Sequence, residues 1–343
     1  TGFLSYVMQI LNSFIMISNV FLLLTRSLAS IHRICEVLDE SVDLVSPEAP
    51  ITEVADGSVE FRDVSFKYRA DAAENALEHV NLSIPAGSTV GVLGGTGSGK
   101  TTLVQLIPRL YDASEGSVLV GGRDVRSYDL EALRNAVSIV LQKNVLFSGT
   151  VRENLCWGNP KATPEELLEA CRRARVDEFL DRLPGGLEYD LGQGGVNVSG
   201  GQKQRLCIAR ALLKRPRVLI FDDSTSAVDT ATDADIRASL AALTGVTKII
   251  IAQRVSSVAD ADQIVVLDDG RVHAVGTHAE LLASDSIYQE IYASQTHGPK
   301  GDGVERGHQA APGNVGWVKT NPSQKGQAAP ENAGWVKTNP SQK

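Results

Sequence analysis

The first 25 residues are mostly apolar and carry no charge, and Arg26, His32 and Arg33 follow them directly. Because a helix of about 20 apolar residues crosses a bilayer, we predict a transmembrane helix over residues 1–25. A secretory signal would have its basic residues before the apolar run. Here they follow it, which places the C-terminal end of the helix in the cytoplasm. Residue 1 is Thr and not Met, so we expect a longer chain with further membrane spans.

Four polar side chains interrupt this apolar stretch at spacings of four, three and seven: Ser5, Gln9, Asn12 and Asn19. Residues at these spacings share one face of a helix. Polar groups inside a membrane face other helices or a water-filled pathway instead of lipid. This face could therefore form hydrogen bonds to a neighbouring helix or line a pathway, and the pattern fits both explanations.

Residues 26–56 are predicted to form a polar helical extension and then a linker, which contains two prolines after Ser46. From residue 57 to 297 the pattern is that of a globular α/β domain. Apolar or alternating runs predict strands at 59–66, 80–84, 88–93, 117–120, 137–141, 218–221, 248–252 and 263–267. Helical patterns lie at 102–107, 128–136, 163–175 and 199–214. Alternation of strands and helices favours a mainly parallel sheet. Residues 142–213 contain no strong strand pattern and predict a helical insertion.

The hydrophobic pattern ends near His297, and we predict a disordered tail over residues 298–343. The tail contains a tandem duplication, because residues 309–325 recur as 327–343 with two differences. Two copies are too few for a self-supporting repeat fold, which needs about three. The Trp in each copy is a candidate docking residue.

Composition narrows the class of protein. The 343 residues are 43% hydrophobic and 22% charged, as in ordinary globular proteins, and the net charge of −8 gives no support to a nucleic-acid partner. The four cysteines are far apart and form no C-x-x-C pair. Neither a zinc site nor a disulfide framework is therefore indicated, and a reducing compartment fits best.

A glycine-rich loop carries the main chemical signal. It consists of Gly94, Gly95, Thr96, Gly97, Ser98, Gly99, Lys100 and Thr101, followed by Thr102. This run fits G-x-x-x-x-G-K-[ST], the phosphate-binding loop, and it lies between a predicted strand and a predicted helix, as that motif requires. The backbone N–H groups and the helix N-terminus would bind phosphates of ATP. Lys100 would reach the β- and γ-phosphates, and the Thr101 hydroxyl would ligate Mg²⁺.

Four further features accompany this loop. Asp222 ends an apolar strand and would hold Mg²⁺ through its water shell. Gln142 follows another strand and could reach the same metal and the attacking water. The run Ser199, Gly200, Gly201 and Gln202 opens a helix and forms a second anion-binding N-terminus. Tyr68 offers an aromatic face for adenine. Each has an ordinary structural explanation alone, but their joint occurrence in this order argues against four independent explanations.

Together these residues resemble the nucleotide-binding domain of an ABC transporter of the exporter type. Residues 198–205, Val-Ser-Gly-Gly-Gln-Lys-Gln-Arg, resemble the family signature almost letter for letter. Residues 146–154 resemble the stretch after the exporter Q-loop, and Ser226-Ala227-Val228-Asp229 resembles the D-loop, which adds Asp229 to the nucleotide-binding residues. The resemblance covers roughly residues 1–295.

The resemblance implies a P-loop, RecA-like core sheet with an antiparallel β subdomain and a helical insertion. It also implies a six-helix membrane domain in the cell membrane, of which residues 1–25 resemble the last helix. Two such domains would sandwich two ATP molecules, with the phosphate loop of one facing the signature of the other. The implied partners are a second half-transporter, membrane lipid and a transported substrate.

The sequence departs from the family at two catalytic positions. The family's general base is Glu, and here it is Asp223, whose carboxylate would lie roughly 1–1.5 Å back, a misplacement that can cost about 10²-fold in rate. The family's switch His is here Gln253, which hydrogen-bonds but carries no charge. The loop at 189–195 also has fewer charges than in the family.

We therefore expect impaired hydrolysis at this chain's own site and assembly as a heterodimer, with a homodimer as the alternative. A nucleotide-binding regulatory module with little turnover is a second hypothesis, because of Asp223 and Gln253. An unrelated P-loop ATPase or kinase is a third, which the intact Ser199–Gln202 motif disfavours.

Overall fold

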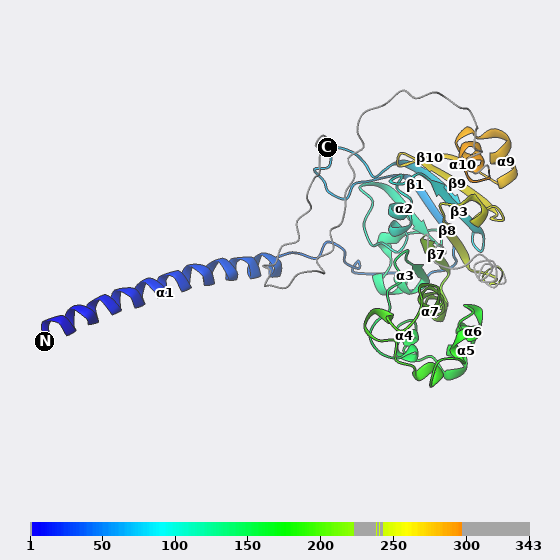
Figure 1. The fold of residues 1–343 in the computed structure, drawn as a ribbon. Coiled ribbons are helices and arrows are strands. Elements are labelled where there is room, and N and C mark those ends of the chain that lie inside the picture. Colours follow the sequence, from blue (N-terminus) through cyan, green and yellow to red (C-terminus); the bar gives the residue numbers. More distant parts are fainter. Residues whose placement is uncertain (1, 223–237, 239, 241–242, 297–343) are drawn as a thin grey trace, which may run out of the picture. The chain divides into compact units, whose positions relative to one another are not determined.

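The computed structural model describes residues 2–222, 238, 240 and 243–296 (Figure 1). The first element is one long helix, α1 (Gly2–Leu38), which continues past the predicted span without a break. No Gly or Pro occurs between residues 3 and 38, so nothing in that stretch interrupts the helix. The helix buries no residue, and its length and composition would allow it to cross a membrane.

An antiparallel sheet follows, with the strand order β2-β1-β4-β5. Its strands are β1 (Val59–Phe66), β2 (Leu77–Ile84), β4 (Glu115–Val120) and β5 (Arg123–Asp124). The inward residues Phe61 and Val64 are three positions apart, which breaks the expected period of two. A register shift lies between them, and Asp63 adopts a φ of 50° there. This bulge returns Val64 to the buried face.

The second sheet has the order β10-β9-β3-β8-β7-β6. Its strands are β3 (Thr89–Gly94), β6 (Val137–Val140), β7 (Val218–Asp222), β8 (Thr247–Ile251), β9 (Gln263–Asp268) and β10 (Arg271–Gly276). All neighbours are parallel except β10, which returns antiparallel to β9. The mainly parallel sheet is confirmed, and β10 is an addition that the sequence analysis did not predict.

The parallel strands share a register that brings four chain segments to one edge. Val140 pairs with Phe221, Asp222 with Ile251, and Ile251 with Val92. Loops that leave parallel strands at their carboxyl ends form the usual ligand site of such sheets. The phosphate loop and the segments after β6, β7 and β8 therefore begin at the same edge.

The remaining helices either cover the sheets or form the insertion. Their bounds are α2 (Lys100–Leu106), α3 (Leu130–Ala136), α4 (Val151–Cys156), α5 (Pro164–Arg173), α6 (Asp177–Leu180), α7 (Gly200–Leu213), α9 (His278–Ser284) and α10 (Ser286–Thr296), with 3₁₀ turns at Val125–Ser127, Gly186–Glu188, Gln193–Gly195 and Val255–Ser257. Helix α3 begins later than predicted, because Asp129 caps it by accepting a hydrogen bond from the Ala132 amide.

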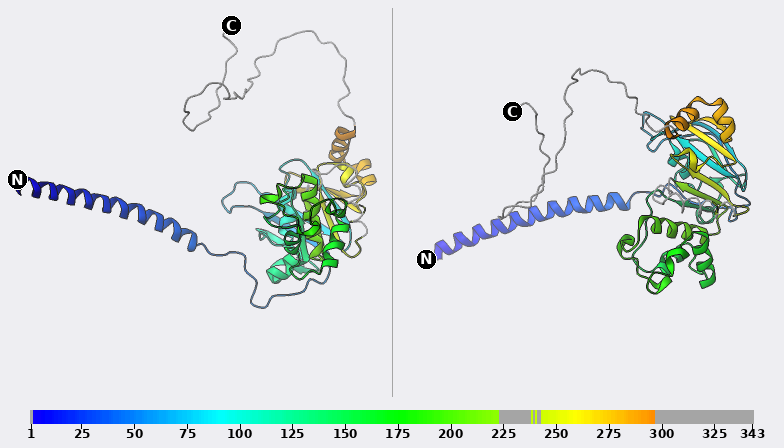
Figure 2. Two further views of the ribbon diagram at one scale, coloured as in Figure 1. Left: turned by 60° about the horizontal axis from the view of Figure 1, so that its bottom comes forward. Right: turned by 45° about the vertical axis from the view of Figure 1, so that its right-hand side comes forward.

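Helices α4 to α7 build the predicted insertion around a core of their own. Leu155, Leu167 and Ile208 are fully buried there and belong to one cluster. Figures 1 and 2 show α4, α5 and α6 gathered at the end of the domain away from α9 and α10. No helix–strand alternation occurs in residues 142–213, all of which are described, so the helical insertion agrees with the sequence pattern.

Candidate functional site

The phosphate loop connects β3 to α2 at the carboxyl edge of the second sheet. Gly97 and Gly99 adopt φ values of 86° and 90°, which favour glycine. At Gly99 a Cβ would also lie 2.7 Å from the Ala76 carbonyl oxygen, so no side chain fits. At Gly95 and Gly97 a Cβ would meet no atom within 4 Å. The backbone there is open to a ligand.

Lys100 crosses this loop from the first turn of α2. Its ammonium donates hydrogen bonds to the carbonyl oxygens of Gly94 at 3.0 Å and Gly95 at 2.6 Å. The Ser98 hydroxyl oxygen lies 3.3 Å from the same nitrogen. The loop thus curves around a fixed positive charge beside a helix N-terminus, an arrangement that binds anions such as phosphate.

Thr101 and Asp222 meet beside this loop. The Thr101 hydroxyl donates to Asp222 Oδ1 at 3.1 Å, and Asp222 ends β7 with only 7% of its surface exposed. Mg²⁺ prefers oxygen ligands and is usually held by one or two carboxylates together with substrate phosphates and water. A hydroxyl and a carboxylate beside a phosphate loop fit that donor set. Within the described ranges no group of three His, Cys, Asp or Glu could hold a metal by itself.

Gln142 and Gln253 lie at the same edge of the sheet. Each follows the last residue of its strand by two positions, after β6 and β8 respectively, and both side chains are exposed. Asp223 and Asp229 lie outside the described residues. The structure therefore brings Gln142, Gln253 and Asp222 to the edge that carries the phosphate loop.

Tyr68 follows β1 and approaches α2 with its hydroxyl. That hydroxyl lies 2.9 Å from Thr102 Oγ1, and the ring is 53% exposed. Phe66 and Tyr111 contact the ring edge-on, with centroids 4.9 Å and 5.3 Å away. One aromatic ring is thus held beside the phosphate loop by two others, as a stacking platform for a base requires.

Two further residues near Tyr68, Tyr111 and Gln105, were not predicted from the sequence. Gln105 accepts a second, longer hydrogen bond from the Tyr68 hydroxyl at 3.4 Å. Gln105 lies three residues after Thr102, so helical periodicity could have placed both on one face. Tyr111 had no such local signal, because its contact with Tyr68 depends on the tertiary fold.

Ser199 and Gln202 form the start of α7 in the helical insertion. The Ser199 hydroxyl accepts from the Gln202 amide at 3.3 Å, and the Ser199 amide donates to Gln202 Oε1 at 2.8 Å. This reciprocal pair is a capping box. Gly200 has open space around it, and Gly201 follows in the first turn. These hydrogen bonds run within the motif and not to the phosphate loop, and α7 packs in the core of the insertion.

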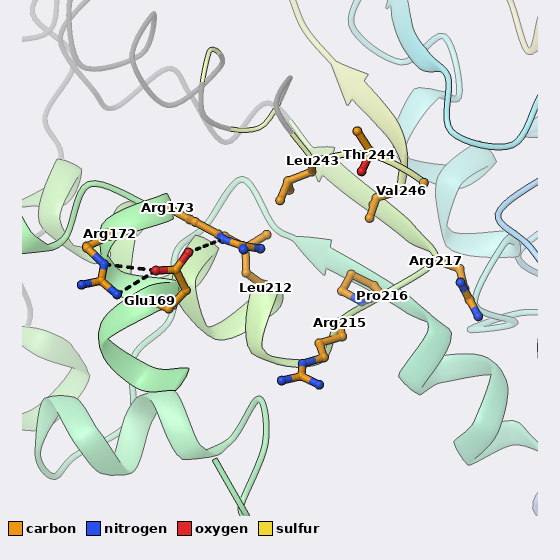
Figure 3. Close-up of a pocket in the computed structure, with 11 residues that line it drawn as sticks. Glu169, Arg172, Arg173, Leu212, Arg215, Pro216, Arg217, Leu243, Thr244 and Val246 are labelled. Atoms are coloured by element: carbon orange, nitrogen blue, oxygen red, sulfur yellow. Dashed lines mark hydrogen bonds and ion pairs between the residues drawn. The ribbon is translucent and has the colours of Figure 1, made fainter. Parts of the chain in front are cut away.

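A cleft of about 720 Å³ lies at the amino ends of β7 and β8, away from the phosphate loop (Figure 3). Arg172, Arg173, Arg215 and Arg217 line it, but their guanidinium groups point in different directions. Glu169 pairs with Arg172 and Arg173, and Glu166 pairs with Arg215. Three of the four arginines are therefore paired with a carboxylate, and the cleft shares no residue with the candidate site.

Comparison with known proteins agrees with this geometry. Residues 77–226 match the family model described as ABC transporter. The chain is 40% identical over 292 residues to an uncharacterized ABC transporter ATP-binding protein, YfiB, and 42% identical over 296 residues to a putative multidrug export ATP-binding/permease protein, YgaD, both of Bacillus subtilis (strain 168). These matches cover 85% and 86% of this chain.

A solved structure of a bacterial Atm1-family ABC exporter with ATP bound superposes with a TM-score of 0.75 at 37% identity, over 80% of this chain and 48% of that one. The chain spans about half the length of the curated relatives it matches, at 50% and 51% of their sequences.

Proposed function

Since the chain carries an ABC transporter ATP-binding domain with exporter-type relatives, we propose that it is the ATP-binding and ATP-hydrolysing half of an exporter. It would couple ATP-driven association with a partner domain to movement of a substrate across the cell membrane. The observation that carries this proposal is the phosphate loop closed around Lys100, with Thr101 hydrogen-bonded to Asp222 beside it.

Within this proposal each residue of the loop edge has a role. The open backbone from Gly94 to Gly99 would bind the phosphates, Lys100 would neutralise them, and Tyr68 would stack on adenine. Thr101, Asp222 and Gln142 would hold Mg²⁺, which supplies charge neutralisation on the phosphates. Gln253 would hydrogen-bond the γ-phosphate.

The proposed domain plan follows the predicted boundaries. Residues 1–25 would span the membrane, and residues 26–56 would connect that span to the nucleotide-binding domain at 57–297. Residues 298–343 would form a tail. Two features of α1 support the membrane role: it is long and apolar enough to cross a bilayer, and it buries no residue.

We further propose that the working unit is an asymmetric heterodimer. The two altered positions, Asp223 and Gln253, would belong to one site together with this chain's phosphate loop. The intact Ser199–Gln202 motif would complete the other site, with a partner that supplies Glu and His. Both altered catalytic positions would fall at one nucleotide site, whereas the motif that serves the other site is intact. This difference supports a dimer with two unequal sites.

The test compares two variants of the assembled transporter, each of which removes the side chain that caps the start of one helix. Ser199→Ala removes a capping box at the signature, and Thr163→Ala removes one at the start of α5. Loss of either cap costs about 1 kcal/mol of stability. Only Ser199→Ala should also abolish most ATP turnover, because it removes γ-phosphate positioning from the faster site.

Four outcomes separate the hypotheses. Turnover restored by a partner chain supports the heterodimer. Ordinary transporter rates from this chain's full-length homodimer would exclude it. Equal damage from Asp223→Ala and Ser199→Ala in the complex would contradict the assignment of this chain's own site as the slower one. Nucleotide binding without turnover in any assembly would favour a regulatory module instead.

A further inference from the structure

The last turn of α10 reaches the loop that follows β8. Gln295, on that turn, uses both ends of its side-chain amide. Its Nε2 donates to the Gln253 carbonyl oxygen at 2.7 Å, and its Oε1 accepts from the Val255 amide at 2.8 Å. One side chain therefore fixes two backbone groups of the loop that carries Gln253.

Backbone contacts also anchor this loop on both sides of Gln253. Before it, the Ala252 amide donates to the Val92 carbonyl of β3 at 3.2 Å, and after it Val255 is buried. Gln253 and Arg254, between these two anchors, are exposed. Because backbone position determines where a side chain can reach, the Gln295 amide helps to set the direction of the Gln253 side chain.

Helix α10 is itself held firmly on the domain. Tyr288 is fully buried, its hydroxyl lies 2.6 Å from His278 Nδ1, and its amide donates to Asp285 Oδ1 at 2.7 Å. Ile291 and Tyr292 pack against the cluster that contains Val255. Gln295 thus projects from a fixed support, as a residue that positions another must.

We propose that Gln295 is a positioning residue, which holds Gln253 where its amide contacts the γ-phosphate of ATP. The inference rests on the proposed function for the assignment of Gln253. A neutral amide lacks the charge of a protonated His and binds only through well-directed hydrogen bonds. Its contribution therefore depends on how precisely the loop is held.

The experiment measures the ratio of ATP to ADP affinity in the full chain, with fluorescent nucleotide analogues and Mg²⁺. Gln295→Met removes both hydrogen bonds and keeps a side chain of similar length. Loss of one well-placed hydrogen bond to the γ-phosphate should lower the ratio on the order of fivefold. Binding of ADP should not change, because the phosphate loop is intact.

Gln289→Met is the matched control. Gln289 lies on the same helix, and its Nε2 donates to the Leu282 carbonyl at 2.8 Å, within the α9–α10 pair. It makes the same kind of bond without reaching the Gln253 loop. A general weakening of α10 would appear in both variants, whereas a positioning effect would appear only in Gln295→Met.

A double-variant cycle with Gln253→Ala completes the test. If Gln295 acts through Gln253, then Gln253→Ala should lower the ratio and Gln295→Met should add nothing to it. The inference would be overturned if the losses from Gln295→Met and Gln253→Ala were additive, or if Gln289→Met lowered the ratio as much as Gln295→Met. It would also be overturned if the ratio stayed unchanged in Gln295→Met or in Gln253→Ala. Each of these results would leave nucleotide binding itself intact. Failure of the unmodified chain to bind Mg·ATP would overturn the proposed function as well.

Discussion

The hydroxyl of Thr101 donates to the carboxylate of Asp222 at 3.1 Å, although 121 positions separate the two residues in the chain. Thr101 lies in the first turn of α2, and Asp222 is the last residue of β7. The parallel sheet brings them together, and both oxygens belong to the donor set that Mg²⁺ prefers.

Thr101→Ala should weaken ATP binding in Mg²⁺ by about tenfold, the loss of one charge-assisted interaction. In EDTA the variant and the unmodified chain should bind ATP nearly alike, because no metal then needs the hydroxyl. Titration with a fluorescent ATP analogue under both conditions measures this difference. Thr101→Ser keeps the hydroxyl and should behave as the unmodified chain. Equal losses with and without Mg²⁺ would exclude a metal-linked role.

Lys100→Ala should weaken ATP binding by about 10- to 150-fold, because it removes charged hydrogen bonds to phosphate. Isothermal titration of the full chain measures the affinity, and thermal unfolding reports whether the loop remains folded. Lys161→Ala, which removes an exposed charge in the helical insertion, serves as the control for net charge. Unchanged ATP affinity in Lys100→Ala would contradict the assignment of the phosphate loop.

Tyr68→Ala should cost about 1–3 kcal/mol of ATP affinity, the usual value for stacking of one base on an aromatic ring. Tyr68→Phe retains the ring and loses only the hydroxyl, with its contacts to Thr102 and Gln105, so it should cost much less. Comparison of ATP with inorganic triphosphate identifies the moiety involved. The two variants should bind triphosphate equally well, and a loss there would point to the phosphates instead of the base.

The pair of His79 and Asp63 should make stability depend on pH. Their side chains lie 2.8 Å apart, and the pKa of His79 is raised, first by the hydrogen bond that its ring donates to Asp63 and then by the charge of that carboxylate. A raised pKa in the folded state stabilises the fold below the unfolded value of about 6.5. That contribution disappears as the pH rises through the raised pKa.

Asp63→Asn should therefore lower the melting temperature more at pH 5.5 than at pH 8.5. Asn also tolerates the positive φ of 50° at this position, so the backbone is preserved. The site is exposed, and a small difference is expected. A larger loss at pH 8.5 than at pH 5.5 would reverse the predicted sign.

The proposed topology places Arg26 and all later residues in the cytoplasm. A cysteine introduced at Leu28, after the native cysteines are replaced, should react with membrane-impermeant thiol reagents only once cells are opened. Labelling in intact cells would show the opposite orientation. Exposure of Leu28 in the described chain is 57%, so access within the protein should not limit the reaction.

Local signals account for most of what the sequence predicted correctly. The glycine spacing predicted the turn between β3 and α2, and uniform apolar runs predicted buried parallel strands such as β7. Some elements were missed although a signal existed. Thr150 and Glu153 form a capping box at α4, as do Thr277 and Glu280 at α9, and both fit the S/T-x-x-E pattern.

Other features had no local signal, because they depend on contacts between distant segments. Gln295 and Gln253 are 42 positions apart, and nothing near Gln295 in sequence marks it as a partner of the β8 loop. The insertion of one residue between Phe61 and Val64 is visible in the sequence, but only pairing with β2 identifies it as a bulge. The roles of Asp223 and Asp229 stay predictions, since both lie outside the described residues.

The shared register of the parallel strands has a consequence for changes in chain length. Asp222 pairs with Ile251, which pairs with Val92, so these loops start from a common line. Deletion of one residue within β7 would retract Asp222 by about 3.3 Å and turn its side chain to the other face. Deletions and insertions inside β3, β7 or β8 should therefore be excluded from functional chains. The turn at Pro85 to Ser88, at the opposite edge, is tied to the start of β8, because the Gly87 amide donates to Thr247 Oγ1 and the Lys248 amide donates to the Ser88 carbonyl.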